Sequence, residues 1–413
     1  MKLGDAHLSY CLNIHRGESW AENKEAIHTC ARAVRDQLGV TEPFGLGLRI
    51  GAAAAEDLRD PAERTAFAAY LAEHNLYAFT VNAFPFGTFH GTRVKEQVYA
   101  PDWRSDERVE YTTLVADILA DLLPEGVEGS ISTVPASFKP WIKTDADVDA
   151  MIERVLRTAT HLRHLEREQG AYIHLGLEPE PACYLETTAE MVAFYKKLLA
   201  AAIAADPANG EELVRRYIGV CFDCCHVALQ FEELEQALDT YLAEGILISK
   251  VHLSAALHLN VADHLAVADH LAVADHIDGE LNLDALRTFD EPVYLHQVKA
   301  RTSDGAVHSW TDLSPGLDGV AELHQQSKTA AAAKLEAIRC HFHVPLFWAG
   351  NPGGLGTTRD CLTPAFFKKL RHATPHMEIE TYTFDVMPAE LQKPDVVASI
   401  VPEFQWVLAQ FSV

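Results

Sequence analysis

The sequence is poor in basic residues. Its 413 residues include 34 Lys and Arg against 59 Asp and Glu, which gives a formal net charge of −25. A protein that binds a nucleic-acid backbone or an anionic membrane surface needs clustered Lys and Arg. The charge therefore argues against both of these partners. The charge favours a small molecule as the partner, and it is compatible with a homo-oligomer.

The sequence also lacks a long apolar run. No segment reaches the ~18 uninterrupted apolar residues of a transmembrane helix. Asp5, His7 and Asn13 stand where a signal peptide would carry its apolar stretch. The eight cysteines show no paired zinc-ribbon spacing, and those at 221–225 are expected to pack as small apolar side chains. We therefore expect a cytoplasmic protein without direct membrane insertion.

A third absence is the glycine-rich dinucleotide motif. No GxGxxG follows the first predicted strand, which disfavours a doubly wound dinucleotide-binding sheet. Short β-rich runs instead alternate with helix-like stretches rich in Ala, Leu, Glu and Arg, which is the pattern of a parallel sheet. The predicted strands are residues 7–15, 44–50, 77–84, 126–134, 171–178, 217–223, 246–253, 340–347 and 377–384.

Polar residues gather where the predicted strands end. Asn82, Glu178, Asp223 and His252 stand at the ends of four of these runs. In a barrel of parallel strands all such ends face one opening, where the active site forms. We therefore predict an α/β fold of the (β/α)8 TIM-barrel type, organised as a single domain over residues 1–413.

Nine predicted strands are one too many for this barrel. His252 and Glu380 are 128 residues apart, far more than one strand–helix unit requires. We therefore place an insertion between the seventh and eighth strands, over residues 255–335, and expect a β-hairpin within residues 293–312. The insertion opens with a six-residue Val-Ala-Asp-His repeat at residues 261–276, interpreted as a duplicated surface segment.

Two glutamates, one aspartate and one histidine form the strongest candidate site. Glu178, Asp223 and His252 end successive strands, and Glu380 lies in the last one. Carboxylates with one imidazole suit Mn²⁺, Mg²⁺, Co²⁺ or Zn²⁺ of the catalytic type. Three carboxylates in one pocket would repel each other unless a cation lay among them. We therefore predict one divalent metal bound by these four residues.

Further polar and aromatic residues are predicted to contact the substrate. They are His226, Asn82, His90, Arg93, His343 and Tyr382. His226 follows Asp223 by three residues and should point into the same cavity. Arg93 and Lys95 are candidate anchors for a phosphate or carboxylate group.

The histidine ligand has an alternative. His341 and His343 share one face of the predicted strand 340–347, and a normal strand–helix distance separates them from Glu380. That strand could be the true seventh strand of the barrel. His343 would then replace His252 as the ligand.

The order of the ligands resembles the xylose-isomerase-like TIM-barrel superfamily, whose members present Glu, then Asp with His three residues later, then His, then Glu. This resemblance implies the same metal ligands. Longer motifs over nearly the whole chain resemble the metabolite-traffic protein EboE family. These motifs include YCLNIH at 10–15, NAFPFG at 82–87, YLHQV at 294–298, CHFHVPLF at 340–347 and EIETY at 378–382. The EboE resemblance implies a role in moving or processing a secondary metabolite.

Two functions fit these observations. The first is a metal-dependent sugar or sugar-phosphate isomerase or epimerase, in which the metal stabilises an enediolate while Glu178 and Glu380 remove and return a proton. The alternative is a non-catalytic small-molecule binding or carrier protein on the same barrel. The four converging ligands favour the enzyme, and the charge of −25 opposes a nuclease.

Overall fold

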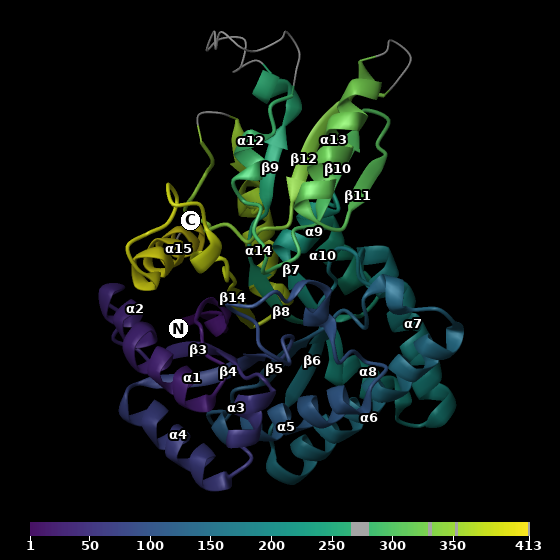
Figure 1. Cartoon of the computed structure of the whole chain (residues 1–413). Coiled ribbons are helices and arrows are strands. Elements are labelled where there is room, and N and C mark those ends of the chain that lie inside the picture. Colours follow the sequence, from purple (N-terminus) through teal and green to yellow (C-terminus); the bar gives the residue numbers. More distant parts are fainter. Residues whose placement is uncertain (266–280, 329–332, 352–353, 412–413) are drawn as a thin grey trace.

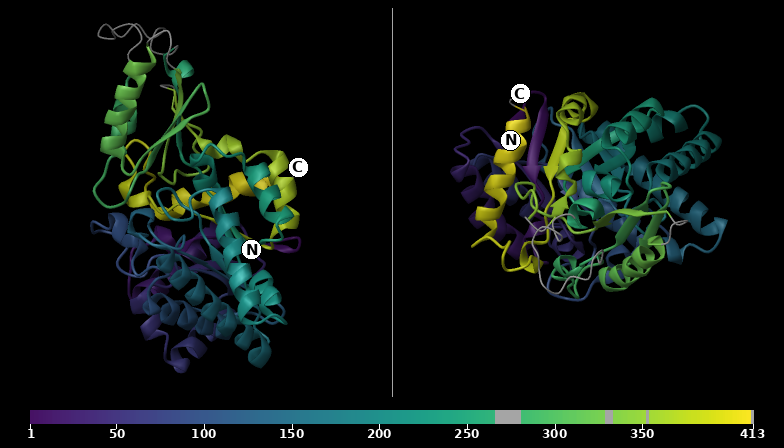
Figure 2. Two further views of the ribbon diagram at one scale, coloured as in Figure 1. Left: turned by 90° about the vertical axis from the view of Figure 1, so that its right-hand side faces the viewer. Right: turned by 90° about the horizontal axis from the view of Figure 1, so that it is seen from above.

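The computed structural model describes residues 1–265, 281–328, 333–351 and 354–411. These residues form a barrel with a second, smaller sheet at one end (Figure 1). Two further views show the same arrangement, with the small sheet standing on the barrel (Figure 2).

Eight parallel strands form the barrel, in the spatial order β2-β14-β8-β7-β6-β5-β4-β3. They are β2 (Ala6–Tyr10), β3 (Phe44–Arg49), β4 (Leu76–Asn82), β5 (Gly129–Thr133), β6 (Ile173–Leu177), β7 (Ile218–Asp223), β8 (Leu247–Leu253) and β14 (His376–Ile379). A parallel bridge between Cys11 and Gly47 joins the two ends of the sheet, and β1 (Lys2–Leu3) pairs antiparallel with β2. The predicted (β/α)8 barrel is therefore confirmed.

Helices cover the outside of the barrel. They are α1 (Trp20–Ala26), α2 (Arg32–Gln37), α3 (Ala52–Asp57), α4 (Pro61–Glu73), α5 (Asp106–Leu122), α6 (Asp145–Gln169), α7 (Thr188–Ala205), α8 (Gly210–Tyr217), α10 (Leu234–Ala243), α14 (Pro364–Ala373) and α15 (Val396–Phe411). The short helix α9 (Cys224–Leu229) follows β7 directly and is wholly buried. The longest, α6, begins at a capping box of Thr144 and Asp147 and ends at Gly170, whose φ of 73° favours glycine. Among the helices that the structure describes, none has the length and apolar character to cross a membrane.

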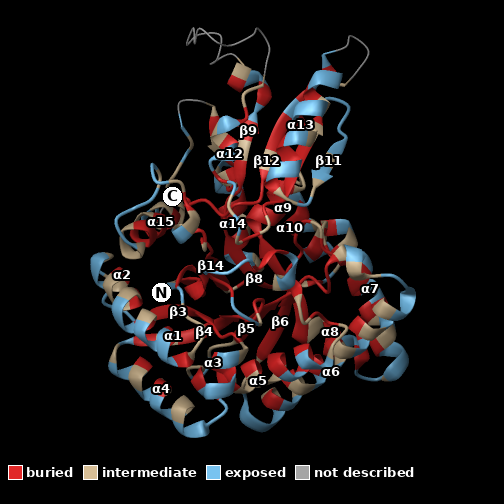
Figure 3. Ribbon diagram, in the orientation of Figure 1, coloured by how far each residue is buried: buried red, intermediate tan, exposed pale blue. Residues whose placement is uncertain are grey.

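A five-stranded antiparallel sheet is inserted between β8 and β14, the seventh and eighth barrel strands. Its order is β11-β10-β12-β9-β13. The elements are β9 (Leu257–Asn260), β10 (Val298–Thr302), β11 (Val307–Trp310), β12 (Leu335–Cys340) and β13 (Leu355–Thr357), with α12 (Asp284–Arg287) and α13 (Leu313–Ser327). Buried residues continue from the barrel into the base of this sheet (Figure 3).

The inserted sheet decides three points of the sequence analysis. The predicted hairpin exists, because β10 pairs with β11. The inserted sheet extends to Thr357, so the insertion ends later than the predicted boundary at residue 335. Most of the Asp-His repeat lies outside the described residues. The suggestion that residues 340–347 form the seventh barrel strand is wrong. β12 ends at Cys340 and pairs with β9 and β10, whereas β8 pairs with both β7 and β14.

An ion pair lies inside the barrel beneath the opening. The ammonium of Lys250 on β8 is 2.6 Å from a carboxylate oxygen of Glu378 on β14, and both side chains are fully buried. Gly47 on β3 leaves room for this carboxylate, since a Cβ at that position would lie 1.6 Å from Glu378 Oε1. A glycine at residue 47 is therefore needed for the barrel to close around the pair.

Glu403 fastens α15 to the loops above the barrel. Its Oε2 accepts hydrogen bonds from the backbone N–H of Leu346 (3.0 Å) and from the hydroxyl of Thr381 (2.8 Å). Burial raises the pKa of Glu403 to about 7, against these two hydrogen bonds, which lower it. In the folded protein the carboxyl of Glu403 therefore gains its charge around neutral pH instead of near pH 4.5.

Replacing Glu403 with glutamine should stabilise the protein at pH 8 more than at pH 5. A carboxyl whose folded pKa lies above its ordinary value of 4.5 costs stability as the pH rises from about 4.5 to about 7. A shift of this size corresponds to about 3 kcal/mol. Melting curves of both proteins over this pH range measure the difference, with Glu244→Gln on the surface as the control. A difference that does not grow with pH would contradict the assignment.

Candidate functional site

Four charged side chains meet at the carboxyl end of the barrel. Glu178 follows β6, Asp223 ends β7, His252 lies in β8 and Glu380 follows β14. The Nδ1 atom of His252 is 3.1 Å from Glu178, 3.4 Å from Asp223 and 2.9 Å from Glu380. One ligand atom of each residue lies within 4.8 Å of the others, and all four residues are buried. The strand ends thus bring together the four residues that the sequence analysis grouped.

Two oxygens of this cluster are poorly satisfied by the described residues. Oε2 of Glu178 is buried and accepts no hydrogen bond from them, and Oδ2 of Asp223 is buried with a long contact of 3.4 Å to Nδ1 of His252. The other oxygen of Asp223 accepts from the backbone N–H of His226 and the hydroxyl of Ser254, both at 2.9 Å. Buried carboxylate oxygens without partners are costly unless a cation satisfies them. The donor set therefore fits a divalent metal ion.

The charges within the cluster are strongly coupled. Burial lowers the pKa of His252, but Cys221, Glu380 and Glu178 raise it, and the net result lies well above the ordinary value. Burial would raise the pKa of Asp223, yet the surrounding imidazoles hold it well below its ordinary value. Without a metal, one imidazolium would thus sit among three acidic groups and compensate only part of their charge.

The second ring nitrogen of His252 faces another carboxylate. Its Nε2 lies 3.3 Å from Oε2 of Glu378, which is itself paired with Lys250. A histidine that binds a metal commonly donates its other N–H to a carboxylate, which fixes the ring orientation. Glu378 is placed to orient His252 with Nδ1 directed at the carboxylates.

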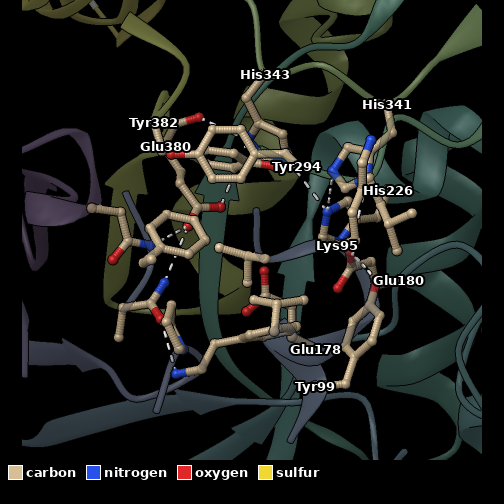
Figure 4. A pocket seen from close by; sticks show the side chains of 18 residues that line it. Lys95, Tyr99, Glu178, Glu180, His226, Tyr294, His341, His343, Glu380 and Tyr382 are labelled. Atoms are coloured by element: carbon tan, nitrogen blue, oxygen red, sulfur yellow. Dashed lines mark hydrogen bonds and ion pairs between the residues drawn. The ribbon is translucent and has the colours of Figure 1, made fainter. Parts of the chain in front are cut away.

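A pocket opens above the four residues (Figure 4). It is lined by Asn13, Asn82, Phe84, Pro85, Phe89, Val94, Lys95, Val98, Tyr99, Glu178, Glu180, His226, Tyr294, Leu295, His341, His343, Glu380 and Tyr382. The apolar and aromatic residues form its walls, while the carboxylates and histidines face inward. Such a combination is typical of small-molecule sites.

Only some of the predicted substrate-binding residues line this pocket. They are Asn82, His226, His343 and Tyr382. The ring nitrogens of His90 contact the carbonyl oxygen of Asn13 and the hydroxyl of Tyr294, each at 2.6 Å, so His90 supports the wall from behind. Arg93 is exposed and is not part of the lining. The loop carries it away from the barrel opening.

The insertion closes one side of the pocket. Tyr294, Leu295, His341 and His343 all come from the segment between β8 and β14. Lys95 reaches the pocket, but its ammonium lies 2.7 Å from Asp312 at the start of α13. Lys95 therefore forms an ion pair between the loop after β4 and the insertion, and its charge is already compensated by Asp312.

Sequence reasoning missed Glu180. Its Oε1 accepts a hydrogen bond from the hydroxyl of Tyr99 at 2.8 Å, deep in the pocket. Burial, with the carboxylates of Glu178 and Asp223, raises its pKa well above the ordinary value, although the bond from Tyr99 lowers it. The Glu-Pro-Glu spacing could have revealed it, because side chains two residues apart in extended backbone share a face.

Comparisons with known proteins find only distant likenesses. No known family profile and no curated protein matches the sequence. Among solved structures, the IolI protein with a bound zinc atom is 13% identical, with 98% of each chain covered and a TM-score of 0.45. A xylose isomerase domain containing protein from Salmonella typhimurium LT2 is 10% identical, with both chains fully covered and a TM-score of 0.41. A magnesium-bound xylose isomerase-like TIM-barrel protein from Mycobacterium smegmatis is 16% identical over 55% of this chain and 65% of that one, with a TM-score of 0.37. The solved neighbours are thus xylose isomerase-like TIM-barrel proteins, too distant to assign a reaction.

Proposed function

We propose that this protein is a divalent-metal-dependent isomerase or epimerase of a small hydroxy-carbonyl compound, of the sugar or cyclitol class. The observation that carries the proposal is the buried set Glu178, Asp223, His252 and Glu380, in which two carboxylate oxygens are poorly satisfied by the described residues. Mn²⁺, Mg²⁺, Co²⁺ and Zn²⁺ all suit this donor set. The bound ion would hold the carbonyl oxygen and the neighbouring hydroxyl oxygen of the substrate, and it would offset the negative charge that develops when a proton leaves the hydroxyl-bearing carbon.

The two glutamates have different surroundings. Oε1 of Glu380 accepts hydrogen bonds from the amides of Asn13 (3.0 Å) and Asn82 (3.1 Å). Oε2 of Glu178 accepts none from the described residues. Glu178 is therefore the less constrained carboxylate, and it takes the proton from the substrate with the oxygen that does not hold the ion, while Glu380 returns one on the other side. The aromatic wall keeps bulk water from the carboxylates and so preserves their basicity.

Aromatic side chains form part of the pocket wall. Tyr294 and Tyr382 both line the pocket, and their ring centroids lie 5.3 Å apart in an edge-to-face contact.

The alternative is a carrier that encloses a metabolite without turnover, as the resemblance to the EboE family implies. The converging carboxylates favour the enzyme, because holding a ligand does not require a proton acceptor next to it. Both proposals have a small-molecule partner and the same pocket.

Deuterium exchange separates the two functions. Protein loaded with each of the four metals should catalyse exchange at the carbon beside the carbonyl of at least one ketose, aldose or cyclic keto-polyol in D2O, as followed by NMR. Glu178→Gln should slow this exchange by about 10²–10⁴-fold. Glu166→Gln, on the outer helix α6, is the control and should retain the rate.

Two outcomes would contradict parts of this proposal. Undiminished exchange in Glu178→Gln would remove Glu178 from the reaction while leaving an enzyme. A compound that raises the melting temperature of the wild type without any exchange, under all four metals, would identify a carrier.

A further inference from the structure

The pocket is lined by one basic side chain, and its charge is already paired. Among the described residues that line the pocket, Lys95 is the single Lys or Arg. Its ammonium lies 2.7 Å from a carboxylate oxygen of Asp312 and 3.4 Å from the carbonyl oxygen of Glu291. The residues outside the described part of the chain include no Lys or Arg. Those residues therefore cannot supply a further Lys or Arg to the pocket.

Two buried cations lie close to the pocket, and each has its own carboxylate. The guanidinium carbon of Arg49 is 5.6 Å from the centre of the Phe89 ring, and Arg49 is paired with Glu18. Lys250, inside the barrel beneath the opening, is paired with Glu378. Neither charge is available to a ligand in the pocket.

The carboxyl groups around the pocket outnumber the charges of one metal ion. Glu178, Glu180 and Glu380 line the pocket, and Asp223 belongs to the same cluster. A divalent ion offsets two negative charges. A phosphate ester would bring about two more at neutral pH. Because no Lys or Arg is free to pair with it, that phosphate would lose its water without gaining an opposite charge, which is strongly unfavourable.

Two oxygens at the pocket are acceptors that lack a donor. Oε2 of Glu178 and Oδ1 of Asn13 are buried and accept no hydrogen bond from the described residues. A hydroxyl group can donate to such an oxygen, whereas a phosphate dianion carries acceptor oxygens alone. These two oxygens therefore favour a ligand rich in hydroxyl groups.

Two histidines of the wall are acceptors as well. Nδ1 of His343 is 3.0 Å from the carbonyl oxygen of Glu380, and Nδ1 of His341 is 2.6 Å from Oε1 of Gln297. The amide of Gln297 is oriented by its Nε2, which donates to the carbonyl oxygen of Pro181 at 3.1 Å. Both Nδ1 atoms therefore carry the ring protons, and Nε2 of each neutral ring accepts. Figure 4 shows both rings at the wall of the pocket.

The opposite character is found in three aromatic rings of the same pocket. Phe89, Tyr294 and Tyr382 contact one another, with ring centroids 5.1, 5.4 and 5.3 Å apart. A sugar or cyclitol ring has hydroxyl groups at its rim and C–H groups on its faces. The aromatic rings can cover such a C–H face while the acceptors bind the hydroxyl groups.

We propose that the substrate of this pocket is uncharged, a free polyhydroxy carbonyl compound, and that the pocket rejects the phosphate ester of the same compound. The ion pair of Lys95 with Asp312 is the element that withholds the one basic side chain of the lining from a phosphate. This inference rests on the proposed function only in taking this pocket as the substrate site.

Binding of matched compounds tests the proposal. Protein loaded with Mg²⁺ is offered D-fructose, D-tagatose, D-ribulose and myo-inositol, each beside its monophosphate, and saturation-transfer NMR follows binding. The sugar esters carry the phosphate at the end of the chain remote from the carbonyl. At least one free compound should bind, and its ester should bind more than about tenfold more weakly. An ester that binds as tightly as its free partner would overturn the proposal, and so would a failure of all four free compounds to bind.

A charge variant tests the role of Lys95. Asp312→Asn removes the paired carboxylate, and Asn can still cap the start of α13. This variant should bind the ester about tenfold more tightly than the wild type does and the free compound equally well. Asp318→Asn, which affects an exposed ion pair on the same helix, is the control and should change neither affinity. No gain for the ester in folded Asp312→Asn would overturn the role of the ion pair.

The same experiment separates this inference from the proposed reaction. A free compound that binds but shows no deuterium exchange would contradict the isomerase and support the specificity inferred here. Exchange that is faster with an ester than with its free partner would support the isomerase and overturn this specificity.

Discussion

Replacing Glu378 with leucine should lower the free energy of unfolding of the metal-free protein by about 3–5 kcal/mol. The carboxylate of Glu378 lies 2.6 Å from the ammonium of Lys250, and both side chains are fully buried inside the barrel. Without the carboxylate, the ammonium of Lys250 still donates a hydrogen bond to Thr80 Oγ1, at 3.1 Å, but no longer faces the negative charge of Glu378. A buried charge without an opposite charge is among the most destabilising changes in a protein core.

A second substitution should recover much of this loss. Lys250→Met in the Glu378→Leu background removes the uncompensated charge, so the double variant should be more stable than Glu378→Leu alone. Glu244→Gln, which breaks a surface ion pair with Lys196, is the control and should change stability by less than about 1 kcal/mol. Urea unfolding in EDTA measures all four proteins.

The contribution of Glu378 should also depend on pH. Burial raises its pKa, but Lys250 and His252 outweigh burial and hold the pKa at about 2. A depressed carboxyl pKa stabilises the folded protein above the ordinary value of 4.5, and this stabilisation is lost as the pH falls from about 4.5 to about 2. If Glu378→Leu were as stable as the wild type at pH 7, the pair would not be charged in the folded state.

Loss of one ligand from the carboxylate cluster should remove one full equivalent of metal. We expect Glu178→Ala, His252→Ala and Glu380→Ala each to bind the ion more than about 100-fold more weakly, because each removes one of its four protein ligands. Elemental analysis after desalting measures the loss. Glu166→Ala on the outside of the barrel provides the control.

The histidine variants test which histidine belongs to the carboxylate cluster. His252→Ala should abolish binding of the ion. His343→Ala should leave the ion in place. If Glu178→Ala and Glu380→Ala both kept every equivalent of the wild type, the carboxylate cluster would not be a metal site.

The barrel and its main cluster could be predicted because the evidence for them is local. The barrel strands are buried on both faces, so they appear as apolar runs of strand length. Glu178, Asp223 and His252 lie at the ends of such runs, and parallel strands bring their ends to one side. The 128 residues between His252 and Glu380 placed the insertion for the same reason.

Tertiary structure alone decided how the insertion meets the barrel. His226 and His341 are 115 residues apart in the sequence, and their contact depends on how the inserted sheet lies on the opening. The same packing pairs Lys95 with Asp312 and leaves Arg93 exposed. Local periodicity determines which residues form a strand and which residues stand at its carboxyl end. It does not determine where a long insertion packs on the barrel, because that depends on contacts between residues far apart in the sequence.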